Sequence, residues 1–190
     1  MNSTPAAAAV ATASGVPGAG SEAGRRALRR FASGVTVLTV NHDGVRHGTT
    51  VSAVVAISRE PLLLGACLRS SSAFTALARE AGVFSVNVLS SEQASLARQF
   101  AVPGRHRGDA QFADVKWTTD NMTGAPLIDG CLAHMACALT GDQEIGDHHL
   151  LTAEVLAGDA GQGAPLLAFA GQLWHEGLAA LDTRTPEDKE

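Results

Sequence analysis

The stretch SGVTVLTVNHDGVRHGTTVSAVVAIS, residues 33–58, decides the fold class of this chain. Asp43 and Gly44, in its middle, are typical of a two-residue hairpin turn, so we expect two antiparallel strands joined there. With the period of two, four apolar residues share one face of the second strand: Val51, Ala53, Val55 and Ile57. Thr50 and Ser52 share the other face. This strand is therefore expected to bury one face and to present hydroxyls on the other near its start.

The segments that follow extend this pattern of strands with a few short helices. LLLGACL, residues 62–68, is a continuous apolar run of the kind found in strands buried on both sides. Three helices are predicted by apolar spacing and capping residues: 23–32, 73–81 and 92–101. Four further strands are predicted: 83–89, 131–140, 148–157 and 166–174. Residues 101–112 are predicted to be a mobile loop. Since the strands form hairpins more than βαβ units, we predict a mainly β fold, an antiparallel barrel with helices packed on its outside.

Composition limits the classes of function. The chain has 190 residues, 45% of them hydrophobic, which suits one domain with a core of its own. A net charge of −5, with no basic stripe and only 4% aromatic residues, argues against nucleic-acid binding. We expect a disordered tail at 1–20, a domain at 21–182 and a short tail at 183–190. The residues suggest neither a signal peptide nor a membrane span, and three cysteines without a pairing pattern suggest a reduced, cytoplasmic protein.

The segment RSSSAF, residues 69–74, lies between the apolar strand and the following helix. Free N–H groups and the helix dipole favour an anion at a helix N-terminus, and Arg69 with neighbouring hydroxyls would complete such a site. The alternative is that one serine simply caps the helix. The residues by themselves leave both possibilities open, as well as the division of roles among Ser70, Ser71 and Ser72.

Two adjacent histidines follow near the end of the chain. In a strand, His148 and His149 point to opposite faces and cannot share one metal ion. No Cys and His spacing typical of zinc is present either, so we expect no metal site.

Four segments, in this order, carry a family resemblance: residues 31–101, GAPLIDG at 124–130, GDHHLLTAEV at 146–155 and PLLAFAGQLWHEGL at 165–178. Together they resemble the short-chain flavin reductases, the NAD(P)H:flavin oxidoreductases that serve two-component monooxygenases. The resemblance runs from about Arg26 to Leu178. It implies an FMN-binding split β-barrel, antiparallel and Greek-key-like, that is usually a homodimer with flavin near the subunit interface.

The resemblance also implies roles for particular residues. TTVSAV would run beside the isoalloxazine ring, SSSAF would take the flavin phosphate, and VNVL would follow the ring and ribityl chain. His148 would lie at the nicotinamide side and is the candidate catalytic residue. The implied cofactor contacts are Thr49, Thr50, Val51, Ser52, Ala53, Cys67, Arg69, Ser70, Ser71, Ser72, Phe74, Asn87, Val88, Leu89, Phe112 and His148.

The chain departs from the family pattern at a few positions. Thr49 replaces a common Met, and Gln111 stands before Phe112 where relatives often have Lys or Arg. Arg105 or Arg107 could supply that cationic contact instead. Ala153 replaces a common Gly.

The function implied is hydride transfer from NADH to FAD or FMN, with NADPH as another donor, supplying reduced flavin to a partner monooxygenase. Such chemistry belongs to the cofactors, so the lack of a catalytic triad or carboxylate pair is no objection. Two alternatives remain open. One is a non-catalytic flavin-binding electron carrier or sensor on the same barrel. The other is an oxidase that acts on pyridoxamine phosphate with bound FMN, for which a second basic cluster is missing.

Overall fold

A computed structural model describes residues 21–106 and 108–175 of the chain. The tails predicted for 1–20 and 183–190 lie outside the described residues, as does the end of the predicted domain at 176–182.

The described residues form twelve strands, three α-helices and two 3₁₀ helices. The strands are β1 (Ser33–Gly34), β2 (Thr36–His42), β3 (Val45–Val51), β4 (Val54–Arg59), β5 (Leu62–Arg69), β6 (Val83–Val88), β7 (Trp117–Thr119), β8 (Pro126–Ile128), β9 (Ala133–Ile145), β10 (His148–Ala160), β11 (Leu167–Phe169) and β12 (Gln172–Trp174). The helices are α1 (Glu22–Leu28), α2 (Ala73–Ala81), α3 (Ala94–Ala101), η1 (Ser91–Gln93) and η2 (Gly108–Phe112).

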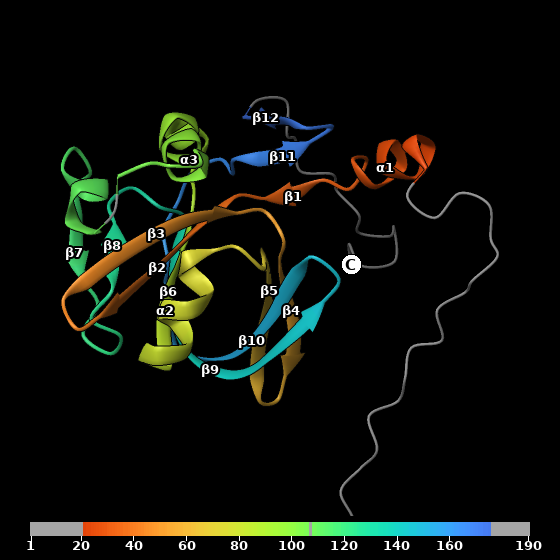
Figure 1. Ribbon diagram of the computed structural model, residues 1–190. Coiled ribbons are helices and arrows are strands. Elements are labelled where there is room, and N and C mark those ends of the chain that lie inside the picture. Colours follow the sequence, from red (N-terminus) through yellow and green to blue (C-terminus); the bar gives the residue numbers. More distant parts are fainter. Residues whose placement is uncertain (1–20, 107, 176–190) are drawn as a thin grey trace, which may run out of the picture.

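Seven of the strands form one antiparallel sheet in the order β3-β2-β6-β9-β10-β5-β4. The sheet curves so that β2 and β3 lie on one side of α2 and β9 and β10 on the other (Figure 1). One buried cluster takes residues from strands near both ends of this sheet, including Val51 of β3 and Leu64 of β5. Phe74 and Ala78 of α2 belong to the same cluster. The sheet therefore wraps around this cluster, and α2 packs into it.

A second buried cluster lies on the other face of β2, beneath α3. Val37 of β2 packs there with Phe100 of α3 and with Phe112 at the end of η2. Since Leu38 and Val40 point into the first cluster, β2 is covered on both faces. This explains why five consecutive residues of β2 are buried. Two small sheets, β1-β11-β12 and β7-β8, complete the described fold.

The predicted hairpin at Asp43 and Gly44 is confirmed, with His42 paired to Val45 across the turn. Both turn residues have positive φ, 49° and 79°, which a type I′ turn requires and which glycine adopts without strain. The prediction for the second strand is wrong in one respect. The chain breaks at 52–53, because β3 pairs with β2 whereas β4 pairs with β5 at the opposite edge of the sheet.

The change of pairing partner between β3 and β4 also affects which side chains of β4 are buried. The side chains of Val55 and Ile57 on the edge strand β4 are 59% and 49% exposed. The predicted buried face is therefore wrong for β4, because Val54, from the other face, packs against the first cluster.

The strand predicted at 166–174 is a hairpin of β11 and β12, turned by Ala170 and Gly171, which both have positive φ. The predicted mobile loop at 101–112 ends in η2, where Gln111 and Phe112 are buried. The capping box that begins the third helix is confirmed, and the N–H of Ser90 donates to Oε1 of Gln93 at 2.9 Å.

None of the described helices is long and apolar enough to cross a membrane.

Candidate functional site

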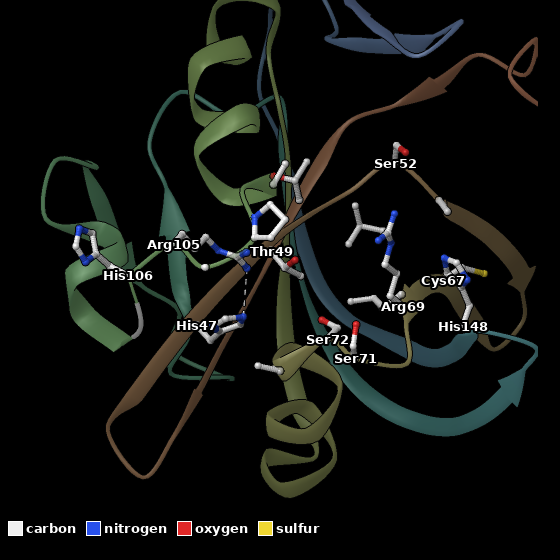
Figure 2. Close-up of a pocket in the computed structure, with 18 residues that line it drawn as sticks. His47, Thr49, Ser52, Cys67, Arg69, Ser71, Ser72, Arg105, His106 and His148 are labelled. Carbon is white, nitrogen blue, oxygen red and sulfur yellow. Dashed lines mark hydrogen bonds between the residues drawn. The ribbon is translucent and has the colours of Figure 1, made fainter.

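A cavity of about 630 Å³ opens where the β3–β4 crossing, the end of β5, the start of α2 and the segment after α3 meet. This volume falls within the range of typical small-molecule and cofactor sites. The lining residues are His47, Thr49, Thr50, Val51, Ser52, Ala53, Cys67, Leu68, Arg69, Ser71, Ser72, Ala73, Ala101, Pro103, Gly104, Arg105, His106 and His148. Figure 2 shows Arg105 and His47 on one side of it and Arg69, Cys67 and His148 on the other.

The charge of the lining contrasts with that of the whole chain. The chain carries a net charge of −5, but the described residues that line the cavity include two arginines and three histidines and no acidic residue. Such a lining favours anionic ligands.

The turn before α2 forms one end of the cavity. Ser72 is the N-cap residue of α2, but its side chain makes no capping hydrogen bond. The turn is instead held by its backbone, with the N–H of Ser72 donating to the carbonyl of Arg69 at 2.9 Å. The hydroxyls of Ser71 and Ser72 can therefore serve a ligand at the N-terminus of α2, where the first N–H groups of the helix point. Ser72 does not act as a simple side-chain cap.

Ser70 has a different place. It does not line the cavity, and its N–H donates to the carbonyl of Asp147 at 3.0 Å. This bond connects the serine turn to the hairpin between β9 and β10. The residue contributes to the position of the turn.

His148 begins β10 and is paired with Arg69 of β5. Its Nδ1 lies 2.8 Å from a carboxylate oxygen of Asp147. The hydrogen bond with His148 and the charge interaction with it lower the pKa of Asp147. The side chain of His148 reaches the cavity, as the resemblance implies.

His149 points to the other face of the strand, as expected for the next residue along it. Its Nδ1 lies 2.7 Å from Asp142 of β9 and 3.0 Å from Arg79 of α2. Arg79 also forms an ion pair with Asp142. These three residues, the Arg79–Asp142–His149 cluster, connect the last turn of α2 to the β9–β10 hairpin.

Ten of the predicted site residues line the cavity together: Thr49, Thr50, Val51, Ser52, Ala53, Cys67, Arg69, Ser71, Ser72 and His148. The β3 side of this group is held by α3, because Thr50 Oγ1 donates to the carbonyl of Ala97 at 2.7 Å. The hydroxyl of Thr50 is thus already used within the protein.

The structure does not bring the other predicted contacts to the cavity. Besides Ser70, these are Phe74, Asn87, Val88, Leu89 and Phe112. Phe74 and Leu89 have no exposed surface, and Phe112 packs against Phe100. Asn87 is also fully buried, and its amide donates to the carbonyl of Val37 and accepts from the N–H of Ile128. The polar atoms of the Asn87 side chain are therefore engaged within the protein.

The sequence did not indicate His47 as a site residue. It lies on β3 two residues before the predicted segment, and it lines the cavity together with Arg105. Arg105 was predicted only as a possible replacement for the Lys or Arg that relatives often have before Phe112. No local pattern could have joined the two, because 58 residues separate them.

The fold is an antiparallel barrel with a cavity whose described lining carries arginines and histidines, and comparisons with known proteins identify its family. A family model described as "Flavin reductase like domain" matches residues 28–175. The chain is 43% identical over 150 residues to NADPH-flavin oxidoreductase of Streptomyces viridifaciens, covering 78% of this chain and 77% of that protein. It is 38% identical over 151 residues to the reductase component of 4-nitrophenol 4-monooxygenase/4-nitrocatechol 2-monooxygenase of Rhodococcus opacus, covering 80% and 78%.

Solved structures of other proteins point to the same family. BorF, the flavin reductase component of a bacterial two-component tryptophan halogenase, superposes with a TM-score of 0.76 at 32% identity, covering 81% of this chain and 96% of BorF. The NADH:FAD oxidoreductase SgcE6 of Streptomyces globisporus, in complex with NAD and FAD fragments, gives a TM-score of 0.74 at 30% identity, covering 84% and 93%. The chain belongs to the flavin reductase family, and its fold is the split barrel of that family.

The described residues fit a flavin nucleotide. The cavity has a suitable volume, hydroxyls and an arginine stand at a helix N-terminus for a phosphate, and apolar Val51 and Ala53 offer surface to a flat ring.

Proposed function

We propose that this protein is an NAD(P)H:flavin oxidoreductase that uses NADH to reduce FAD or FMN and supplies the reduced flavin to a separate flavin-dependent monooxygenase. One observation carries the proposal. The N-terminus of α2, with Ser72 not engaged in capping and Arg69 beside it, opens into a cavity without acidic residues among those described. Phosphate-bearing cofactors suit this arrangement.

The chemistry is hydride transfer between the bound nicotinamide and the flavin, and the protein contributes binding, orientation and control of water. In the proposed site, Arg69, Ser71 and Ser72 hold the flavin phosphate. The segment from Thr49 to Ala53 lies along the ring. His148, at the side of the cavity beyond Arg69, is proposed to donate a hydrogen bond to the pyridine nucleotide.

The role of His148 has a direct test. Replacing His148 with Ala should raise KM for NADH or lower kcat, while the Kd for flavin changes little. If both KM for NADH and kcat stay at the wild-type values, the role proposed for His148 is wrong.

The function itself is tested by steady-state assays that cross NADH and NADPH with FAD and FMN. NADH oxidation that depends on added flavin is the expected result. Tight flavin binding without NADH turnover would instead indicate a flavin-binding carrier or sensor. Absence of flavin binding in a fluorescence titration would contradict both.

A homodimer is part of the proposal. Val55, Ile57 and Leu62, on or next to the edge strand β4, are each about half exposed, and α1 exposes Leu28. Apolar side chains gathered on an edge strand favour association with a second copy. Ser52 and Ala53 precede this strand and line the cavity, so a partner copy there would border the site. Sedimentation equilibrium should give twice the mass of one chain.

We also propose a cytoplasmic location. Cys67, Cys131 and Cys137 are all free thiols, which suits a reducing compartment. Burial raises the pKa of Cys137 to about 12, so that thiol stays protonated and unreactive.

A further inference from the structure

The end of the cavity away from α2 contains a hydrogen-bonded group of His47, Gly48, Arg105 and Gln111. The backbone N–H of Gly48 donates to Oε1 of Gln111 at 3.0 Å. This contact fixes the orientation of the amide, because a reversed amide would set two donors against each other. The Nε2 of Gln111 therefore faces Nδ1 of His47, at 2.9 Å.

The amide orientation in turn determines the tautomer of His47. The amide nitrogen of Gln111 can only donate, so Nδ1 of His47 accepts. A neutral imidazole with an acceptor at Nδ1 carries its proton at Nε2. Gln111 thus makes His47 a hydrogen-bond donor at Nε2.

The N–H at Nε2 of His47 faces a second hydrogen-bond donor. Nε2 of His47 lies 3.3 Å from a terminal nitrogen of Arg105, and a guanidinium has no acceptor. Figure 2 shows this contact at the side of the cavity opposite Arg69. Two converging donors repel each other, and an anionic oxygen beside them would accept from both.

Arg105 is held in place as a cation. Its terminal nitrogens donate to the carbonyls of Val102 at 3.2 Å and Gly48 at 2.6 Å. Its Nε is buried without a hydrogen-bond partner among the described residues, and none of the described carboxylates forms an ion pair with it. Burial lowers the pKa of Arg105. A guanidinium nevertheless stays charged at neutral pH.

We propose that Arg105 and His47 form a second anion site, set by Gln111, which binds a phosphate group of a dinucleotide while the α2 end binds another. The proposal rests on the proposed function, and it adds a binding role for Arg105 and His47 and a positioning role for Gln111. The phosphate could come from the pyrophosphate of FAD, from the pyrophosphate of the nicotinamide dinucleotide or from the 2′-phosphate of NADPH. All three offer the same oxygen chemistry to the two donors.

The test measures Kd for wild-type protein, Arg105→Met and Arg105→Lys. Fluorescence quenching gives Kd for riboflavin, FMN and FAD, and calorimetry gives Kd for NAD⁺ and NADP⁺. We expect Arg105→Met to weaken at least one phosphate-bearing ligand by about ten-fold or more, since hydrogen bonds to charged groups are among the stronger ones. Arg105→Lys keeps the charge and should restore part of the affinity. Arg29→Met, the matched control, removes an exposed arginine that does not line the cavity and should change nothing.

The ligand that loses affinity identifies the phosphate. A loss for FAD alone indicates its pyrophosphate, and a loss for both NAD⁺ and NADP⁺ indicates the pyrophosphate of the nicotinamide dinucleotide. A loss for NADP⁺ alone indicates the 2′-phosphate. A loss shared by FMN and FAD but not by riboflavin would mean that Arg105 binds the flavin 5′-phosphate, and it would contradict a second site distinct from the α2 end. Unchanged Kd for every ligand would overturn the proposal, and so would an equal loss for riboflavin, which has no phosphate.

Gln111→Glu tests the positioning role. A carboxylate still accepts from Gly48, but it cannot donate to His47, so the proton moves to Nδ1 and Nε2 becomes an acceptor for Arg105. Affinity for the phosphate-bearing ligand should then fall, while affinity for riboflavin stays close to wild type. Equal losses for riboflavin and for the phosphate-bearing ligand would mean that Gln111 only supports the fold. Wild-type protein without flavin-dependent NADH oxidation would contradict the proposed function, whereas an active wild type with phosphate affinity insensitive to Arg105 would contradict only the second anion site.

Discussion

The two ends of the cavity are built in opposite ways. The α2 end takes Arg69, Ser71 and Ser72 from one turn of the chain, between a strand and the helix that follows it. The other end, here called the loop end, joins His47 of β3 to Arg105 and Gln111 in a segment about 60 residues further along. Local geometry is enough to form the first, whereas the second exists only after the barrel has folded.

We expect the largest effect from a substitution at the α2 end. Arg69→Met removes the cation beside the helix N-terminus and should raise Kd for FMN by about ten- to hundred-fold, the range for hydrogen bonds to charged groups. Riboflavin lacks the phosphate and serves as the control ligand in the same fluorescence titration. Equal losses for FMN and riboflavin would place the phosphate elsewhere.

A substitution at Gly48 should disturb the loop end through packing. A Cβ at this position would lie 2.6 Å from a ring carbon of Phe100, too close for any real contact. Gly48→Ala should therefore lower the free energy of unfolding by about 1–3 kcal/mol, as overpacked cores do. Urea denaturation measures this, and Gly44→Ala is not a suitable control because Gly44 has a positive φ. Gly34→Ala is suitable, since nothing lies within 4 Å of its added Cβ. Equal stability of the two variants would contradict the close approach.

Ser72→Ala separates binding from capping at the α2 end. Since the Ser72 side chain makes no capping hydrogen bond, Tm should stay within about a degree of wild type. The Kd for FMN should rise several-fold, in keeping with about 1 kcal/mol for one hydrogen bond. Ser95→Ala, on the exposed side of α3, is the matched control for both measurements. A fall in Tm with unchanged Kd would mean that the Ser72 side chain caps the helix and does not bind the phosphate.

The smallest effect concerns the Arg79–Asp142–His149 cluster, which holds α2 at its far end. Burial alone would raise the pKa of Asp142, but hydrogen bonds from Arg79 and His149 and their charges outweigh it and lower the pKa. A carboxyl with a lowered folded pKa stabilises the fold above its unfolded pKa, near 3.9, and this contribution is lost as the pH falls through the folded value.

Asp142→Asn should therefore reduce stability at pH 7 by less than about 1 kcal/mol, the magnitude of a partly exposed ion pair. The difference from wild type should shrink toward pH 3 in denaturation curves recorded across this range. Asp114→Asn, at an exposed position, should show no such trend. A difference that grows as the pH falls would contradict the sign of the pKa shift.

Much of the fold follows from local sequence patterns. Asp43 and Gly44 require a tight turn, and the apolar spacing of 73–81 gives α2 its buried face. The break between β3 and β4 could not be predicted, because the alternation of apolar residues continues through 52–53 while the pairing partner changes. Val55 and Ile57 show the same limit, since periodicity assigns a face without saying whether anything covers it.

The sequence by itself determined the antiparallel class of the fold, the strand-to-helix turn at 69–73 and the opposite faces of His148 and His149. Each depends on residues a few positions apart, where backbone geometry and side-chain period decide. The tertiary structure alone decided that Asn87 is enclosed and fully hydrogen-bonded, that Ser72 leaves its helix uncapped, and that His47 meets Arg105. The enclosure of Asn87 and the meeting of His47 with Arg105 depend on contacts between distant segments, which form only when the sheet has folded.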